Sequence, residues 1–383
     1  MSAQEIKRKR IAPYMAVGLS SNCRAITKRS DSMNNLRDIE NCIHSAIFLM
    51  SIELPVKLVA LPEGAISGLN SEQYWPDHVS FARECAIDIP GEETDFLGEL
   101  AKHYQTYIIA QAKAKWPEVI KDRFFNTAFL IDPNGKVIWK SAKNHIFARE
   151  HSCTPHDIYD VWVKKFGDGI DAFYPVCKTE DIGNIGGGVC GDGVMPEYGR
   201  ALALNGAEII YRPSFPEPWV GTGAFRVQNR AHALFNNCYV IAPQSGYLYM
   251  HPDMKEPVDT GSGDAHIVDY LGNVLSFSAI PNSIIGAIID IEQLRSFKER
   301  ALFGNFIKDL RTEIFKKMYE KPIHPKNLCI DKPPRQHVDG DEILRDNIKR
   351  LQERGVYTPP AEHFEGAKYI PAKRNPVKLP KKK

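Results

Sequence analysis

The chain has 383 residues, of which 43% are hydrophobic, so it can bury a sizeable core as one large domain or two smaller ones. Its 49 lysines and arginines nearly balance 47 aspartates and glutamates, and the net charge of +2 excludes a broad attraction to nucleic acid or an anionic membrane. No apolar run approaches the roughly 20 residues that span a bilayer, so we expect a cytoplasmic protein with a small-molecule partner.

The first predicted elements alternate between strands and helices. Residues 1–12 are basic and lack the long apolar core of a secretory signal. Hydrophobic periodicity then predicts buried strands and amphipathic helices in turn. The strands are predicted at 13–20, 57–61 and 107–111, and the helices at 33–52 and 93–103.

Two hairpins and a repeated order of elements indicate the architecture. The residues DPNG at 132–135 supply the turn between strands at 124–131 and 136–140, and a second hairpin is predicted at 266–278. After Cys190, a short helix starting at Met195 precedes a strand at 208–212. We therefore expect an α/β protein of two similar halves folded against each other, although the two halves share no close sequence repeat.

Residues 291–383 have a different character and form a predicted C-terminal extension. The pattern is charged and helical over 291–319, proline-rich over 322–334 and helical again over 341–354. The tail at 369–383 is basic, and we expect it to wrap a surface, join a subunit contact or be disordered.

Three reactive side chains each follow an apolar strand at a turn. Glu63 stands in LVALPEG, Lys143 in GKVIWKSAKNH and Cys190 in GGGVCGDGVMPE. A thiol is a useful nucleophile only when it is deprotonated, so it needs a base or a cation within reach. We expect Glu63 to accept the thiol proton, and Lys143 and the backbone N–H of Gly191 to stabilise the oxyanion on an attacked carbonyl.

These motifs, in this order, resemble the carbon–nitrogen hydrolase (nitrilase) superfamily, and NRAHALFNNCYVIAPQSG at 229–246 adds to the resemblance. The resemblance implies a four-layer α-β-β-α sandwich over residues 13–290, followed by an extension at 291–383. It implies that Cys190 is the nucleophile, Glu63 the general base and Lys143 the oxyanion stabiliser. Glu150 falls where many members have a second glutamate that positions substrate and water. Family members usually form homodimers or larger homo-oligomers.

The implied reaction is hydrolysis of an amide through a thioester, which gives a carboxylic acid and ammonia or an amine without metal or cofactor. True nitrilases usually have tryptophan and glutamate after the cysteine, whereas Gly191 and Asp192 stand here. Carbamoylases usually place arginines where Gly193 and Val194 stand. The departures favour an amidase over a nitrilase or an N-carbamoyl amidohydrolase.

Phe147 and Trp219 are candidates for lining the substrate pocket of this amidase. A catalytically inactive binding or scaffold protein on the same fold is the alternative of another class.

Three further sequence patterns carry less weight. Gly186, Gly188 and Gly191 spell G-x-G-x-x-G, but a cysteine interrupts the strand-to-helix context that a dinucleotide loop requires. The eight cysteines contain no C-x-x-C pair, which argues against a disulfide framework or a cysteine zinc site. His145, His151, Cys153 and His156 form a cluster in the sequence, but their spacing matches no known metal motif.

Overall fold

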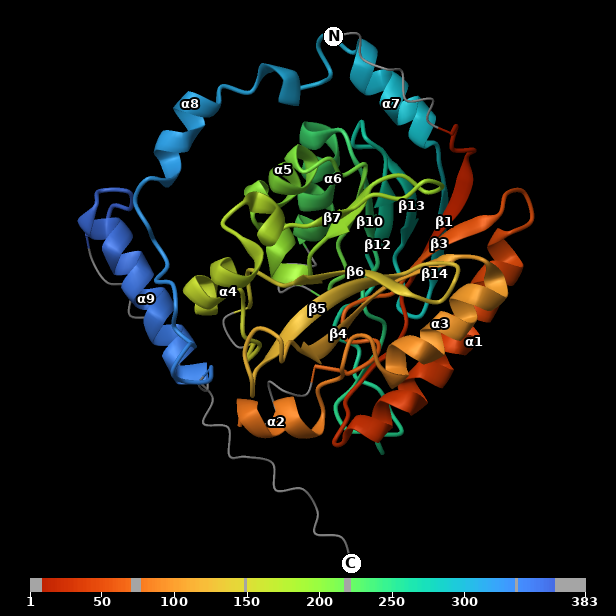
Figure 1. Cartoon of the computed structure of the whole chain (residues 1–383), viewed down its shortest axis with the longest axis horizontal. Helices are drawn as coiled ribbons and strands as arrows, with labels where there is room; N and C mark the ends of the chain where they lie inside the picture. Colours follow the sequence, from red (N-terminus) through yellow and green to blue (C-terminus); the bar gives the residue numbers. More distant parts are fainter. Residues whose placement is uncertain (1–8, 70–76, 148–149, 217–221, 335–336, 362–383) are drawn as a thin grey trace, which may run out of the picture.

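The computed structural model describes residues 9–69, 77–147, 150–216, 222–334 and 337–361. Two six-stranded sheets face each other in the body of the molecule (Figure 1). The first sheet contains, in spatial order, β14 (Ile284–Ile289), β1 (Tyr14–Leu19), β3 (Val56–Ala60), β4 (Tyr107–Lys115), β5 (Phe124–Ile131) and β6 (Val137–Ala142). The second contains β13 (Val274–Ser278), β12 (Ala265–Val268), β10 (Tyr239–Ala242), β9 (Ile209–Tyr211), β8 (Ile185–Gly187) and β7 (Val176–Cys177). A separate two-stranded sheet pairs β2 (Cys23–Arg24) with β11 (Leu248–Tyr249).

Two pairs of helices cover the outer faces of the two sheets: α1 (Ser32–Met50) and α3 (Glu92–Tyr104) on the first, and α5 (Pro196–Leu204) and α6 (Ala224–Asn236) on the second. The body also contains α2 (His78–Glu84) and α4 (Tyr159–Phe166). The C-terminal segment adds α7 (Ile291–Arg300), α8 (Thr312–Phe315) and α9 (His337–Glu353). Within the described part of the chain, no helix combines the length and the apolarity needed to cross a membrane.

Three apolar layers hold the sandwich together. Leu58 and Ile109 of the first sheet share one core with Ile209 and Ile241 of the second. A second core joins α1 and α3 to the first sheet, and a third joins α5 and α6 to the second sheet. Each aliphatic side chain buried in this way contributes about 1.5–3 kcal/mol. The predicted four-layer α-β-β-α sandwich is confirmed.

The two sheets have the same topology. In the first, β1, β3 and β4 are parallel neighbours, β5 and β6 follow in antiparallel pairing, and β14 is antiparallel to β1. In the second, β8, β9 and β10 take the places of β1, β3 and β4, with β12 and β13 following and β7 outside. The expectation of two similar halves is therefore confirmed at the level of topology.

The C-terminal segment departs from its predicted pattern. The helical pattern over 291–319 is interrupted, because α7 ends at Arg300 and only short helical turns follow before residue 320. Ile291 and Leu294 of α7 reach the central core, whereas Leu302 and Phe303 are 85% and 89% exposed. A helix without a face to bury gains little from tertiary packing and does not propagate. Figure 1 shows the segment from α8 to α9 arching along one side of the body.

Candidate active site

Glu63, Lys143 and Cys190 all follow strands of the two facing sheets. Glu63 lies in the turn after β3, and Lys143 comes directly after β6. Because β6 pairs antiparallel with β5, and β5 with β4, β6 runs in the same direction as β3, so both side chains emerge at one edge of the first sheet. Cys190 follows β8 of the second sheet and begins a short 3-10 helix. The edge between the two sheets is where their side chains meet.

Four charged side chains and one amide form a buried network at this edge. Lys143 Nζ donates to Glu150 Oε2 at 2.6 Å and to Glu63 Oε1 at 3.4 Å. Lys113 Nζ, on β4, donates to Glu150 Oε1 at 3.1 Å. Asn126 Nδ2, on β5, donates to both Glu63 Oε1 and Glu150 Oε1 at 2.9 Å. Among the described residues, two cations therefore contact two carboxylates in an almost dry environment.

This network fixes the protonation of its members. Burial lowers the pKa of Lys143, but the Cys190 thiolate and the carboxylates of Glu150 and Glu63 outweigh burial and raise that pKa well above its ordinary value. Burial raises the pKa of Glu150, yet Lys113 and Lys143 outweigh it and lower that pKa far below the usual range. Lys143 is therefore a cation, and Glu150 a carboxylate, at neutral pH.

The backbone around Cys190 brings its thiol beside this network. Cys190 has a φ of +46°, a left-handed conformation that costs a non-glycine residue about 1–3 kcal/mol. Its N–H donates to Pro213 O at 2.8 Å, and two residues further on the Phe215 N–H donates to Glu63 Oε2 at 2.9 Å. The same tripeptide therefore contacts both the cysteine and the glutamate. Cys190 itself is only partly buried.

Asp192 joins the cysteine loop to the loop that follows Lys143. Its Oδ1 accepts the backbone N–H groups of Asn144 at 2.9 Å and His145 at 2.8 Å, and its Oδ2 accepts that of Val189 at 2.9 Å. The contact is close, since a Cβ on Gly191 would lie 2.5 Å from the His145 carbonyl oxygen. The Gly191 N–H belongs to the first turn of the 3-10 helix, where backbone donors have no partner inside the helix.

The side chain of Arg212 packs against the cysteine loop. Its guanidinium is fully buried and donates to Cys190 O at 3.2 Å and to Gln228 Oε1 at 2.8 Å. A Cβ on Gly193 would lie 1.8 Å from Arg212 Nε, so only glycine fits there. His232 Nε2 is 2.7 Å from the Gly193 carbonyl oxygen, and burial lowers the pKa of this histidine to about 4, so the neutral ring donates.

Sequence reasoning did not identify several of these residues. The strand predicted at 107–111 continues to Lys115, and Lys113 lies inside it with no exposure. A lysine flanked by alanines within an apolar strand is the signal that was available. Asn126 lies opposite Lys113 in the β4–β5 register, a pairing that only the structure reveals.

The remaining sequence candidates occupy different surroundings. Phe147 is 50% exposed, and Trp219 lies outside the described residues. The suggested histidine and cysteine cluster does not form a single site. Among the described residues, the group with metal-ligand geometry contains Cys153 but joins it to Asp157 and Cys329.

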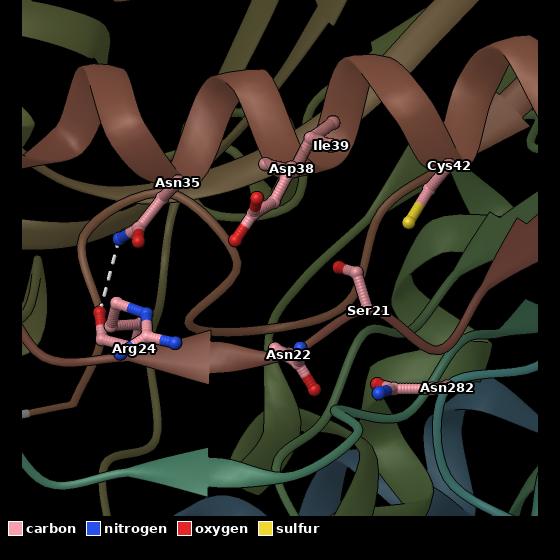
Figure 2. A pocket seen from close by; sticks show the side chains of 8 residues that line it. All are labelled: Ser21, Asn22, Arg24, Asn35, Asp38, Ile39, Cys42 and Asn282. Carbon is pink, nitrogen blue, oxygen red and sulfur yellow. Dashed lines mark hydrogen bonds between the residues drawn. The ribbon is translucent and has the colours of Figure 1, made fainter. Parts of the chain in front are cut away.

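A separate small cavity lies away from the charged network (Figure 2). Its volume is about 130 Å³, and α1 forms one wall of it. Asn35 of α1 donates across it to Arg24 O at 3.0 Å. The residues that line it are Ser21, Asn22, Arg24, Asn35, Asp38, Ile39, Cys42 and Asn282. None of them belongs to the network around Lys143.

Comparisons with known proteins identify a family model and relatives that match this chain. Residues 16–299 match the model of the family described as carbon-nitrogen hydrolase. A deaminated glutathione amidase from Synechocystis sp. is 27% identical over 290 residues, which is 75% of this chain and 96% of that protein.

Two solved structures share the fold. Nit3 from Saccharomyces cerevisiae, a member of branch 10 of the nitrilase superfamily, has a TM-score of 0.59 and 22% identity over 79% of this chain and 98% of its own. A variant of the amidase from Nesterenkonia sp. AN1, with the acetamide moiety of fluoroacetamide added covalently at its active-site cysteine, has a TM-score of 0.56 and 14% identity. It covers 80% of this chain and 97% of its own.

Proposed function

The chain belongs to the carbon–nitrogen hydrolase family of the nitrilase superfamily, and from this premise we propose that its cysteine-dependent hydrolysis of amides is carried out by Cys190, Glu63 and Lys143. Cys190 attacks the carbonyl carbon while its thiol proton passes to Glu63. Glu63 then protonates the departing ammonia or amine, and a thioester remains on the sulfur. Water that has given a proton to Glu63 hydrolyses the thioester to the carboxylic acid and frees the thiol.

The observation that carries this assignment is the cationic, immobile Lys143 beside Cys190. Its Nζ is held by two carboxylates, and its pKa is raised well above the ordinary value as described above, so it serves as a fixed positive charge and not as a base. A cation at that position stabilises first the thiolate and then the oxyanion of the tetrahedral intermediate. With the Gly191 N–H as second donor, a preorganised donor of this kind contributes about 3–4 kcal/mol to lowering the barrier.

Glu150 has a supporting part in this proposal. Both of its oxygens are engaged by lysines, and it remains ionised, so it is a poor proton acceptor. Its role is to orient Lys143 and to keep the charge of the buried network balanced. Lys113 acts through Glu150, Asn126 acts through both Glu63 and Glu150, and both are positioning residues.

We place the substrate among small or neutral amides. Gly193 is packed against Arg212, which leaves no room at that position for the arginine with which carbamoylases bind a carboxylate. Phe147, half exposed after the Lys143 loop, offers an apolar surface to the acyl group, and Trp219 is proposed for the same role. The relative from Synechocystis carries an amidase name, which supports an amide over a nitrile.

The assembly is proposed to be a homodimer or a larger homo-oligomer. On α6, Val227 and Phe235 are 67% and 52% exposed, and the C-terminal segment exposes Leu302 and Phe303 almost fully. Large apolar side chains concentrated on one region are typical of subunit contacts. The eight cysteines are all free thiols, which supports the proposed cytoplasmic location.

A substrate panel tests the proposed function. Aliphatic amides, N-carbamoyl compounds and nitriles are scored for ammonia release with the native protein and with Cys190→Ala. We expect turnover of at least one amide, slower turnover of nitriles and no turnover by Cys190→Ala. Cys238→Ser, which changes a buried thiol on the far side of β9 and β10, is the matched control and retains activity. Unchanged amide turnover in Cys190→Ala would refute the assignment of the nucleophile.

A further inference from the structure

Cys153, Asp157 and Cys329 converge where the C-terminal segment crosses the body. All three are buried, and their sulfur and carboxylate atoms lie within 4.8 Å of one another. Cys153 comes three residues after Glu150, and Asp157 lies in the 3-10 turn His156–Ile158. Cys329 belongs to the C-terminal extension. Two segments far apart in the sequence therefore supply one compact group of side chains.

Backbone hydrogen bonds from both segments hold this group in place. Cys153 N donates to Phe124 O at 2.9 Å, and Cys329 N donates to Asp157 O at 2.8 Å. Arg123 Nε donates to the Cys329 carbonyl oxygen at 3.2 Å. Backbone hydrogen bonds therefore bring the three residues together, and their side chains do not have to extend to meet. A group fixed in this way needs little reorganisation to bind a ligand.

From this convergence we propose that Cys153, Asp157 and Cys329 form a structural site for a zinc ion. Two sulfur ligands select a borderline-soft divalent cation over magnesium or calcium, which take oxygen ligands. Cysteine and aspartate both occur among the ligands of tetrahedral zinc. The fourth ligand of a tetrahedral zinc ion would be water or His324, which interacts electrostatically with Asp157.

The local charges favour such an ion. Two thiolates and one carboxylate would carry three negative charges, which zinc and the adjacent Arg123 guanidinium together would neutralise. Metal binding deprotonates a coordinating thiol, so zinc binding at this site would release protons.

Asp157 already has one structural task that is compatible with metal binding. Its Oδ2 accepts hydrogen bonds from Thr154 N at 3.0 Å and Thr154 Oγ1 at 2.8 Å. Within the described residues, no hydrogen bond is recorded at Oδ1, so this oxygen can coordinate an ion while Oδ2 holds the turn. A disulfide between the two cysteines is the competing arrangement, and it would make no use of Asp157 Oδ1.

The site would connect the extension to the active site. Ser152, next to Cys153, accepts from Lys113 Nζ at 2.9 Å and donates to Glu150 Oε1 at 2.8 Å. A zinc ion at Cys153 would therefore fix both the extension at Cys329 and the loop that carries Glu150. Sequence spacing could not reveal this, because the ligands share no short motif.

Metal binding by the full-length, reduced protein tests the proposal. The Cys190→Ala background removes the catalytic thiol as a competing ligand. We expect one tightly held zinc per chain after dialysis, and a thiolate-to-cobalt charge-transfer band when cobalt replaces it. Cys153→Ser and Cys329→Ser should each weaken zinc binding by more than about 100-fold, beyond the 10–100-fold loss typical of outer-shell changes. Cys238→Ser, a buried cysteine outside the group, should bind zinc normally.

A second readout needs no substitution in the group. Zinc should raise the unfolding temperature of the unsubstituted protein, and a chelator should reverse this effect. Three results would overturn the proposal: no stoichiometric zinc or cobalt in the reduced protein, binding that persists in both serine variants, or a Cys153–Cys329 disulfide in non-reducing peptide maps of metal-free protein. Each result is independent of amide turnover.

Discussion

The ion pair between Lys113 and Glu150 offers a sharp test of the buried network. Both side chains are almost completely buried, at 0% and 6% exposure, so solvent does not screen their interaction. Lys113→Met leaves Glu150 with one of its two lysine contacts, and Glu150→Gln removes the carboxylate that Lys113 Nζ contacts at 3.1 Å. Breaking a buried pair from one side costs about 3–5 kcal/mol, so each single change should lower the free energy of unfolding by that amount.

The double variant Lys113→Met/Glu150→Gln distinguishes a coupled network from independent packing. Because it removes both partners, it should be more stable than the sum of the single changes predicts, by about 0.5–3 kcal/mol in urea unfolding. Lys113→Met should also reduce kcat by about 100-fold, as expected for a misplaced Lys143. Lys140→Met, which breaks a partly exposed pair with Glu118, is the control and should cost less than about 1 kcal/mol. Single-variant costs that add without coupling would refute the reasoning.

Three further predictions follow from individual contacts. Burial lowers the pKa of His78 to about 3, whereas an unfolded histidine titrates near 6.5, so up to about 5 kcal/mol of stability is present above pH 6.5 and is lost as the pH falls toward 3. His78→Asn should flatten that part of the stability profile in urea unfolding, and an unchanged slope would contradict the assignment. Gly193→Ala should reduce amide turnover and lower the free energy of unfolding by about 1–3 kcal/mol, because the added Cβ would clash with the buried Arg212 side chain. Full activity would contradict this prediction, since it would show that the cysteine loop can shift to accommodate the methyl group. Sedimentation equilibrium should give a multiple of the 43.2 kDa chain mass, reduced by Phe235→Asp on α6, and a monomeric native protein would contradict the proposed assembly.

Most of the fold could be predicted from hydrophobic periodicity and turn residues. The strand predicted at 13–20 corresponds to β1, which packs against a core on each face, and the helix predicted at 33–52 corresponds to α1, which packs one face against a core. The turn at 132–135 forms as its chemistry predicts, with Asp132 Oδ1 accepting from Asn134 N and Gly135 at a φ of +77°. Such local signals need no knowledge of distant residues.

Other features depend on tertiary contacts and could not be predicted in this way. The charged residues of 291–319 are spaced as in a surface helix. The helix α7 nevertheless ends soon after its last contacts with the core. β14 pairs with β1, although the two strands are more than 260 residues apart in the sequence.

The site shows the same division between local and distant information. Glu63, Lys143 and Cys190 could be proposed as site residues because each follows a strand in a recognisable motif. Lys113 could not be assigned, because its partner Glu150 comes from a loop that follows another strand. Asp192 stands in the cysteine motif itself, but its role in holding the Lys143 loop is a property of the folded backbone.

The reactivity of Cys190 is the most direct test of the central claim that this thiol is activated by its neighbours. The native protein is treated with a limiting amount of iodoacetamide near neutral pH, and the label is mapped over all eight cysteines. We predict that Cys190 is modified well before the other seven, and that Lys143→Met slows its modification because the thiolate has lost its fixed cation. Slow, even labelling of the accessible thiols, unaffected by that substitution, would contradict the account.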